Sequence, residues 1–87
     1  MNINQAETND KQNLFVSSDL ALTTVVSLYF PIVVIDKQDP RKAQFIFNRS
    51  ENLSELVDKY WKKELLIEPR QYFDQLKALK ARLYGSE

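Results

Sequence analysis

The residues best suited to chemistry lie near the C-terminus, where basic and aromatic side chains alternate. If residues 69–84 form a helix, its turn of about 100° per residue brings several of them onto one flank. This flank consists of Arg70, Phe73, Lys77, Lys80 and Tyr84. Cationic groups pair with phosphates and aromatic rings stack on unpaired bases, so the combination suits single-stranded nucleic acid. Lys62 and Lys63, just before the helix, extend this candidate binding surface.

The same flank also has a structural interpretation. Phe73 and Tyr84 can close the edge of the core while the aliphatic stems of neighbouring lysines cover them. Exposed aromatic residues also dominate protein interfaces, and a patch left by Tyr60 and Trp61 can bind a protein or a second copy of the chain. The sequence therefore predicts a small binding module with two open alternatives. One is contact with nucleic acid, and the other is a protein-interaction or self-associating adaptor, including a homodimer.

Catalytic chemistry lacks its usual side chains. The chain has no histidine and no cysteine, which removes the commonest general base and zinc ligand, thiol nucleophiles and disulfides. Its single glycine, Gly85, precludes a glycine-rich phosphate loop. Glu51, Glu55 and Asp58 could ligate a hard cation, but the helix N-terminus and lysines one turn later offer them ordinary partners. We therefore predict that the protein is not an enzyme and has no catalytic, cofactor-binding or metal-binding residues.

The charge is unevenly distributed although the formal net charge is zero. Residues 1–36 carry one lysine and four acidic residues, whereas residues 37–87 carry 11 basic and eight acidic residues. This asymmetry allows a weakly basic face but falls short of the footprint of a dedicated duplex binder. The absence of cysteine fits a reducing compartment, and no signal-peptide pattern opens the sequence. We therefore expect a cytoplasmic location.

One uncharged stretch, residues 20–35, could belong either to a membrane or to a core. A membrane-spanning helix needs about 20 apolar residues, and this stretch is shorter and interrupted by Pro31. We interpret it as a buried helix, capped by Ser17–Asp19 and ending near Tyr29, followed by a strand over Ile32–Ile35, where every residue is β-branched. No association with a membrane is predicted.

A β-hairpin is predicted from the residues that follow. Asp39-Pro40 marks a turn, after which apolar and polar residues alternate over residues 43–48, as in the second strand of a hairpin. Leu14-Phe15-Val16 is expected to be an extended lead-in that packs on the core. Leu65-Leu66-Ile67 is a candidate third strand beside the hairpin.

Two further helices are predicted in the C-terminal half. Ser50 is a suitable N-cap, and the apolar residues from Leu53 to Trp61 recur at helical spacing. Pro69 suits the first position of the last helix, and Gly85 suits its end. On this last helix the predicted core face comprises Tyr72, Phe73, Leu76, Leu79, Leu83 and Tyr84.

Together these elements predict an α+β fold, in which a β-hairpin, with the candidate third strand, packs against three helices in the order α-β-β-α-(β)-α. Residues 1–13 are expected to form a disordered polar tail, and residues 14–87 a single small domain. The predicted core consists of Leu22, Val25, Val26, Ile32, Val34, Phe45, Phe47, Leu56, Val57, Tyr60, Trp61, Phe73, Leu76, Leu79 and Leu83.

An ordered set of short motifs resembles a known family. The motifs are Ser18-Asp19-Leu20-Ala21-Leu22, Phe45-Ile46-Phe47, Leu56-Val57 with Tyr60-Trp61, Pro69-Arg70 with Phe73, and then Leu76-Lys77, Leu79-Lys80 and Leu83-Tyr84. In order and spacing they are similar to a family of small bacterial and phage proteins classed as a domain of unknown function, over residues 14–84. The resemblance implies a stand-alone small domain of bacteria or their mobile elements. It brings no activity, cofactor or functional residue.

Overall fold

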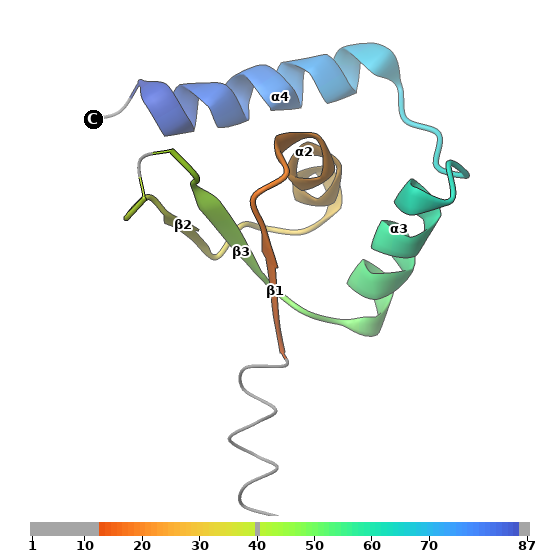
Figure 1. The fold of residues 1–87 in the computed structure, drawn as a ribbon. Helices are drawn as coiled ribbons and strands as arrows, with labels where there is room; N and C mark the ends of the chain where they lie inside the picture. Colours follow the sequence, from red (N-terminus) through yellow and green to blue (C-terminus); the bar gives the residue numbers. More distant parts are fainter. Residues whose placement is uncertain (1–12, 40, 86–87) are drawn as a thin grey trace, which may run out of the picture.

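The computed structural model describes residues 13–39 and 41–85 and has the predicted α+β architecture (Figure 1). The prediction of a disordered tail over residues 1–13 falls outside the described residues except at Asn13. The elements, in chain order, are β1 (Leu14–Ser17), α2 (Leu20–Tyr29), β2 (Val34–Asp36), β3 (Gln44–Asn48), α3 (Glu51–Trp61) and α4 (Pro69–Tyr84).

Helix α2 begins and ends at the residues that the sequence indicates. The Asp19 side chain accepts a hydrogen bond from the Leu22 N–H at 3.1 Å, which satisfies one of the free donors of the first turn. Phe30 has an extended backbone, as the residue before a proline prefers, and ends the helix. Because α2 is apolar on most sides, it can be covered by other elements on most sides.

The sheet is antiparallel, with strand order β1-β3-β2. The hairpin of β2 and β3 is confirmed, and a third strand is present, but β1 forms it instead of Leu65–Ile67. Leu14–Ser17 pairs residue by residue with β3. Residues 64–68 have no regular structure, because they connect α3 to α4, and Leu66 projects into solvent with 93% of its surface exposed.

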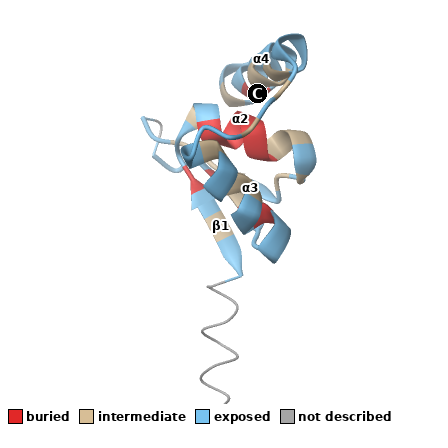
Figure 2. Ribbon diagram, turned by 90° about the vertical axis from the view of Figure 1, so that its right-hand side faces the viewer, coloured by how far each residue is buried: buried red, intermediate tan, exposed pale blue. Residues whose placement is uncertain are grey.

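Helix α2 lies at the centre of the fold and packs against β1, α3 and α4. Figure 1 shows α4 lying across α2 with its C-terminal end beside the turn of the hairpin, and Figure 2 shows the buried segment running along α2. The three helices were expected to cover one face of the hairpin. Helix α4 does so mainly through α2, whose apolar circumference supplies a surface on both sides, while Leu83 of α4 packs against the core cluster.

The core is built mainly from α2, β3 and single residues of α3 and α4. Its fully buried apolar residues are Leu22, Val25, Val26, Phe45, Phe47, Leu53 and Leu79. All of these except Leu53 were in the predicted core.

Three residues of the predicted core are exposed instead. Val34 pairs with Ile46 on the face of the sheet opposite the helices. Trp61 is the last residue of α3, and its ring packs edge-on against Tyr60, with 5.0 Å between the ring centroids. Phe73 lies on the flank of α4, where about half of its surface is exposed. Position on a face or at a helix end, rather than residue type, therefore leaves these side chains in solvent.

Candidate nucleic-acid interface on helix α4

Helix α4 carries most of the candidate surface, and local sequence fixes both of its ends. The Glu68 side chain accepts a hydrogen bond from the Gln71 N–H at 2.7 Å. Pro69 occupies the first turn, where a missing N–H has no effect on helical hydrogen bonding. At the other end the Gly85 N–H donates to the Ala81 carbonyl at 2.8 Å. The helix thus runs as predicted and presents four turns of side chains.

The buried face of α4 is centred on Leu79. Tyr72 and Gln75 lie on either side of Leu79, and both bond to α2: the Tyr72 hydroxyl donates to the Ala21 carbonyl at 3.5 Å and the Gln75 amide donates to Ser27 Oγ at 2.9 Å. Gln75 was not expected on this face. Its inclusion turns the face away from the flank that holds Phe73 and Tyr84.

This rotation leaves both aromatic residues of the flank in solvent. Phe73 is 52% exposed and Tyr84 is 78% exposed, so the prediction that they belong to the core face of the helix is wrong. Lys77 and Lys80 are also exposed. The Lys77 ammonium lies 5.1 Å from the centre of the Phe73 ring, within the range of a cation–π contact. Two aromatic rings and two lysines therefore share an open strip of α4.

Two other basic residues of the candidate surface are paired with acidic neighbours. Arg70 Nε lies 3.7 Å from Asp74 Oδ1, and Lys62 Nζ lies 3.5 Å from Asp58 Oδ2, the pairing expected from their spacing. All four side chains are largely exposed, so each ion pair is worth little and can yield to a phosphate.

Lys63 lies near the Phe73 end of the strip. Its φ of 61° is in the left-handed region, which a helix end often uses. The Lys63 N–H donates to the Tyr60 carbonyl and the Glu64 N–H donates to the Lys59 carbonyl, which closes α3. Lys63 and Phe73 then line the same pocket, of about 590 Å³, between the end of α3 and the start of α4.

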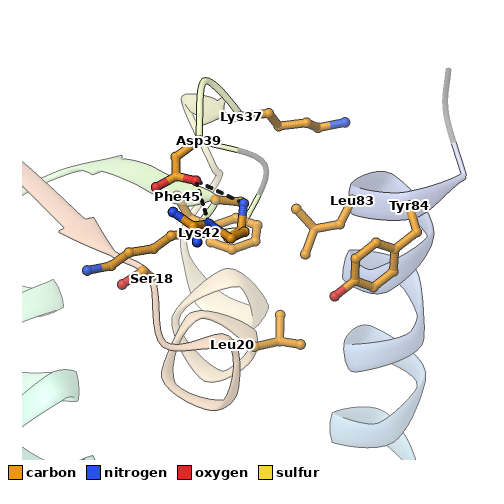
Figure 3. Close-up of a pocket in the computed structure, with 10 residues that line it drawn as sticks. Ser18, Leu20, Lys37, Asp39, Lys42, Phe45, Leu83 and Tyr84 are labelled. Atoms are coloured by element: carbon orange, nitrogen blue, oxygen red, sulfur yellow. Dashed lines mark hydrogen bonds and ion pairs between the residues drawn. The ribbon is translucent and has the colours of Figure 1, made fainter.

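The opposite end of the strip borders a second pocket. Tyr84 and Leu83 line a hollow of about 390 Å³ together with the turn between β2 and β3 (Figure 3). That turn contributes Lys37, Arg41 and Lys42.

Comparison with protein families identifies the family of the chain. A family profile described as Domain of unknown function (DUF5659) matches residues 12–85. The chain belongs to this family. The DUF5659 match covers every described element, so the resemblance inferred from the ordered motifs is confirmed as to family. Comparison with the curated proteins and with the solved structures found no match.

The three basic turn residues of this DUF5659 domain were missing from the predicted site. The available signal was three cations within six positions, around the Asp39-Pro40 turn. What the sequence does not show is that the turn reaches the C-terminal end of α4. Lys37 Nζ donates to the carbonyl oxygen of Arg82 at 3.0 Å and joins the two segments.

The structure also bears on metal binding and on a membrane span. Over residues 13–39 and 41–85, no group of three or more acidic side chains lies together in a way that could hold a metal ion. None of the helices in that part of the DUF5659 domain is both long and apolar enough to span a membrane.

Proposed function

We propose that this protein is a non-catalytic module that contacts single-stranded nucleic acid through one strip of α4. The strip is defined by Phe73, Lys77, Lys80 and Tyr84. The observation that supports the proposal is the exposure of both aromatic rings beside two lysines. Rings that closed the edge of the core would be largely buried, whereas stacking on bases requires an open face.

The dimensions and charge of the strip fit this partner. Phe73 and Tyr84 are 11 positions apart on one helix, which is about 16 Å at 1.5 Å per residue. That length can accompany about five stacked nucleotides at roughly 3.4 Å each. Within the described part of the chain, no ion pair involves Lys77 or Lys80. Their charges are therefore available to phosphates.

A binding titration with charge-reversed variants tests the proposal. Fluorescence anisotropy is measured for labelled single-stranded and double-stranded DNA and RNA of about 12 nucleotides, a length within the usual site size. The proposal predicts saturable binding of single strands that weakens with salt and collapses in the Lys77→Glu/Lys80→Glu variant.

Lys59→Glu is the control for charge reversal away from the strip. Lys59 is also an exposed lysine, but it lies on α3 in a separate pocket with Tyr29 and Phe30, at the C-terminal end of α2. This variant should bind nearly as well as the wild type. Equal binding by the Lys77→Glu/Lys80→Glu variant and the wild type would refute the proposed surface.

A second candidate function, self-association, is favoured by the outer face of the sheet. The register places Val16 and Val34 on either side of Ile46, in one row across all three strands. Val16 is 47% exposed and Val34 is 48% exposed, because the helices pack on the opposite face. An aliphatic face of this kind commonly marks an interface.

The oligomeric state in solution tests this second candidate function. A homodimer that forms through the sheet should sediment as a dimer and should dissociate in the Val34→Glu variant, which adds like charges across a two-fold axis. A monomer at all concentrations would eliminate the candidate. The cytoplasmic location and the origin in bacteria or phages stay predictions.

A further inference from the structure

The pocket at the C-terminal end of α4 combines an apolar floor with a cationic rim. Figure 3 shows Leu20, Phe45 and Leu83 directed toward one another between the turn and the helix. Phe45 is almost fully buried, so it forms a fixed base for the hollow. The polar lining residues are Ser18, Lys37, Asp39, Arg41, Lys42 and Tyr84.

The charge of this rim is positive after its one acidic residue is counted. Asp39 is engaged within the turn, where its Oδ1 accepts the Arg41 N–H at 3.0 Å and lies 4.0 Å from Arg41 Nε. Lys37 donates to a neutral carbonyl, so its charge is not neutralised. Across the described residues, no ion pair involves Lys37 or Lys42. Three cations and one carboxylate thus line a single hollow, with the Lys37 and Lys42 side chains extending to opposite sides of it (Figure 3).

We propose that this pocket binds the terminal phosphate of a nucleic-acid strand, with the attached nucleotide on the apolar floor and against Tyr84. The inference rests on the proposed function of the α4 strip. A terminal phosphomonoester carries about −1.5 to −2 charges at neutral pH, whereas each internal phosphodiester carries one. Several cations around one hollow match the terminal group better than a phosphate in the middle of a strand.

Tyr84 connects the pocket to the strip. Its side chain lines the pocket, and it is also the last aromatic residue of the strip. A strand that follows Phe73, Lys77 and Lys80 along α4 therefore reaches the pocket at its end. The floor accommodates a base without hydrogen-bond selection, so the pocket recognises the end of a strand rather than its sequence.

The test compares strands of one sequence that differ only at their ends. Labelled single strands are competed with unlabelled strands that bear a 5′-phosphate, a 3′-phosphate or hydroxyl groups at both ends. We expect one phosphorylated strand to compete at least about tenfold better than the hydroxyl strand, as charge-assisted hydrogen bonds to a new dianion imply. The arm that shows the gain identifies which end enters the pocket.

Variants of the turn locate the effect. Arg41→Gln/Lys42→Gln removes two rim charges and spares the bond from Lys37 to α4. It should abolish the preference for a phosphorylated end, measured within this variant as the ratio of its affinities for the phosphorylated and hydroxyl strands. Lys59→Gln is the control for charge removal away from the pocket and should retain the preference. Circular dichroism confirms that each variant is folded.

The possible failures are distinguishable. Binding of all three strands with equal affinity would overturn the pocket inference and leave the proposed function standing. A preference that persists in the Arg41→Gln/Lys42→Gln variant would also overturn it, since the phosphate would then bind elsewhere. If none of the strands binds to the wild type, both the inference and the proposed function are wrong.

Discussion

The ammonium group of Lys77 lies 5.1 Å from the centre of the Phe73 ring, one helical turn away on α4. The contact places a cation and an aromatic face side by side on an open surface. Such a contact is worth about 0.5–1 kcal/mol at an exposed site. Both groups remain accessible to a ligand that presents phosphates and bases together.

Substitution of the aromatic residues of the strip should change nucleic-acid binding differently from substitution of its lysines. Phe73→Ala and Tyr84→Ala should each weaken the binding of single strands by about 1–3 kcal/mol, the usual loss when one stacked base is released. Neither change removes a charge, so the dependence of affinity on salt should stay as in the wild type. Anisotropy titrations at several salt concentrations measure both quantities. Unchanged affinity in both variants would argue against base stacking on α4.

The contribution of the core to stability can be tested with the same substitution at a buried and at an exposed leucine. Leu53 is fully buried beside Phe45 and Phe47, and Leu66 projects into solvent. Leu53→Ala should lower the free energy of unfolding by about 2–5 kcal/mol. Leu66→Ala should change it by less than about 0.5 kcal/mol. Urea denaturation measures both, and equal losses would show that the packing of α3 differs from that described.

Two substitutions at Lys63 separate the effect of backbone strain on stability from the effect of charge on binding. A left-handed φ disfavours residues with a Cβ, so Lys63→Gly should raise the free energy of unfolding by roughly 0.5–1 kcal/mol. Lys63→Ala, which retains the strain, should leave stability near that of the wild type. Both variants lose the same charge and should weaken oligonucleotide binding equally. A stabilising effect of Lys63→Ala as large as that of Lys63→Gly would contradict the assigned backbone conformation.

Tyr60 should make stability sensitive to strongly alkaline pH. Burial raises the pKa of its hydroxyl above the usual 10.0, with smaller contributions from the Asp19 carboxylate and Tyr72. Below this pH both the folded and unfolded states keep the proton. As the pH rises past 10.0, the unfolded state releases its proton first, so the free energy of unfolding falls until the folded hydroxyl also ionises.

Tyr60→Phe removes this contribution. Urea denaturation of both proteins on either side of the tyrosine pKa provides the comparison, with the difference between them at pH 8 as the baseline. The wild type should lose more stability than the variant on passing to the higher pH. A larger loss in the variant would mean that the folded state favours the ionised hydroxyl.

The helices and the hairpin could be predicted because their signals are local. Asp19 and Pro31 mark the two ends of α2, and Pro69 and Gly85 mark those of α4. The alternation over residues 43–48 likewise gives β3 directly. Each of these signals acts through the backbone within a few residues, so it does not depend on what the element contacts later.

The third strand and the exact face of α4 depend on contacts between distant residues. Leu14–Ser17 and Leu65–Ile67 are similar short apolar segments, and only the former finds a partner in β3. Gln75 belongs to the buried face because it meets Ser27. Counting apolar residues alone therefore misplaced that face by roughly 50°, half a residue step.

The place of the basic turn residues Lys37, Arg41 and Lys42 in the candidate site also depends on a contact between distant residues. The composition of the turn was visible in the sequence, but Lys37 and Arg82 are 45 positions apart. Only the packing of α4 across α2 brings them together, and with them the pocket beside Tyr84.

The most direct test of the proposed nucleic-acid surface is the slope of log affinity against log salt concentration for a single strand. It is measured for the wild type and for Lys77→Gln/Lys80→Gln. Each phosphate contact on a single strand contributes about 0.7 to this slope, so removing two cations should make it shallower by about 1.4. Parallel slopes for the two proteins would show that Lys77 and Lys80 do not contact phosphates, and the proposed surface would have to be abandoned.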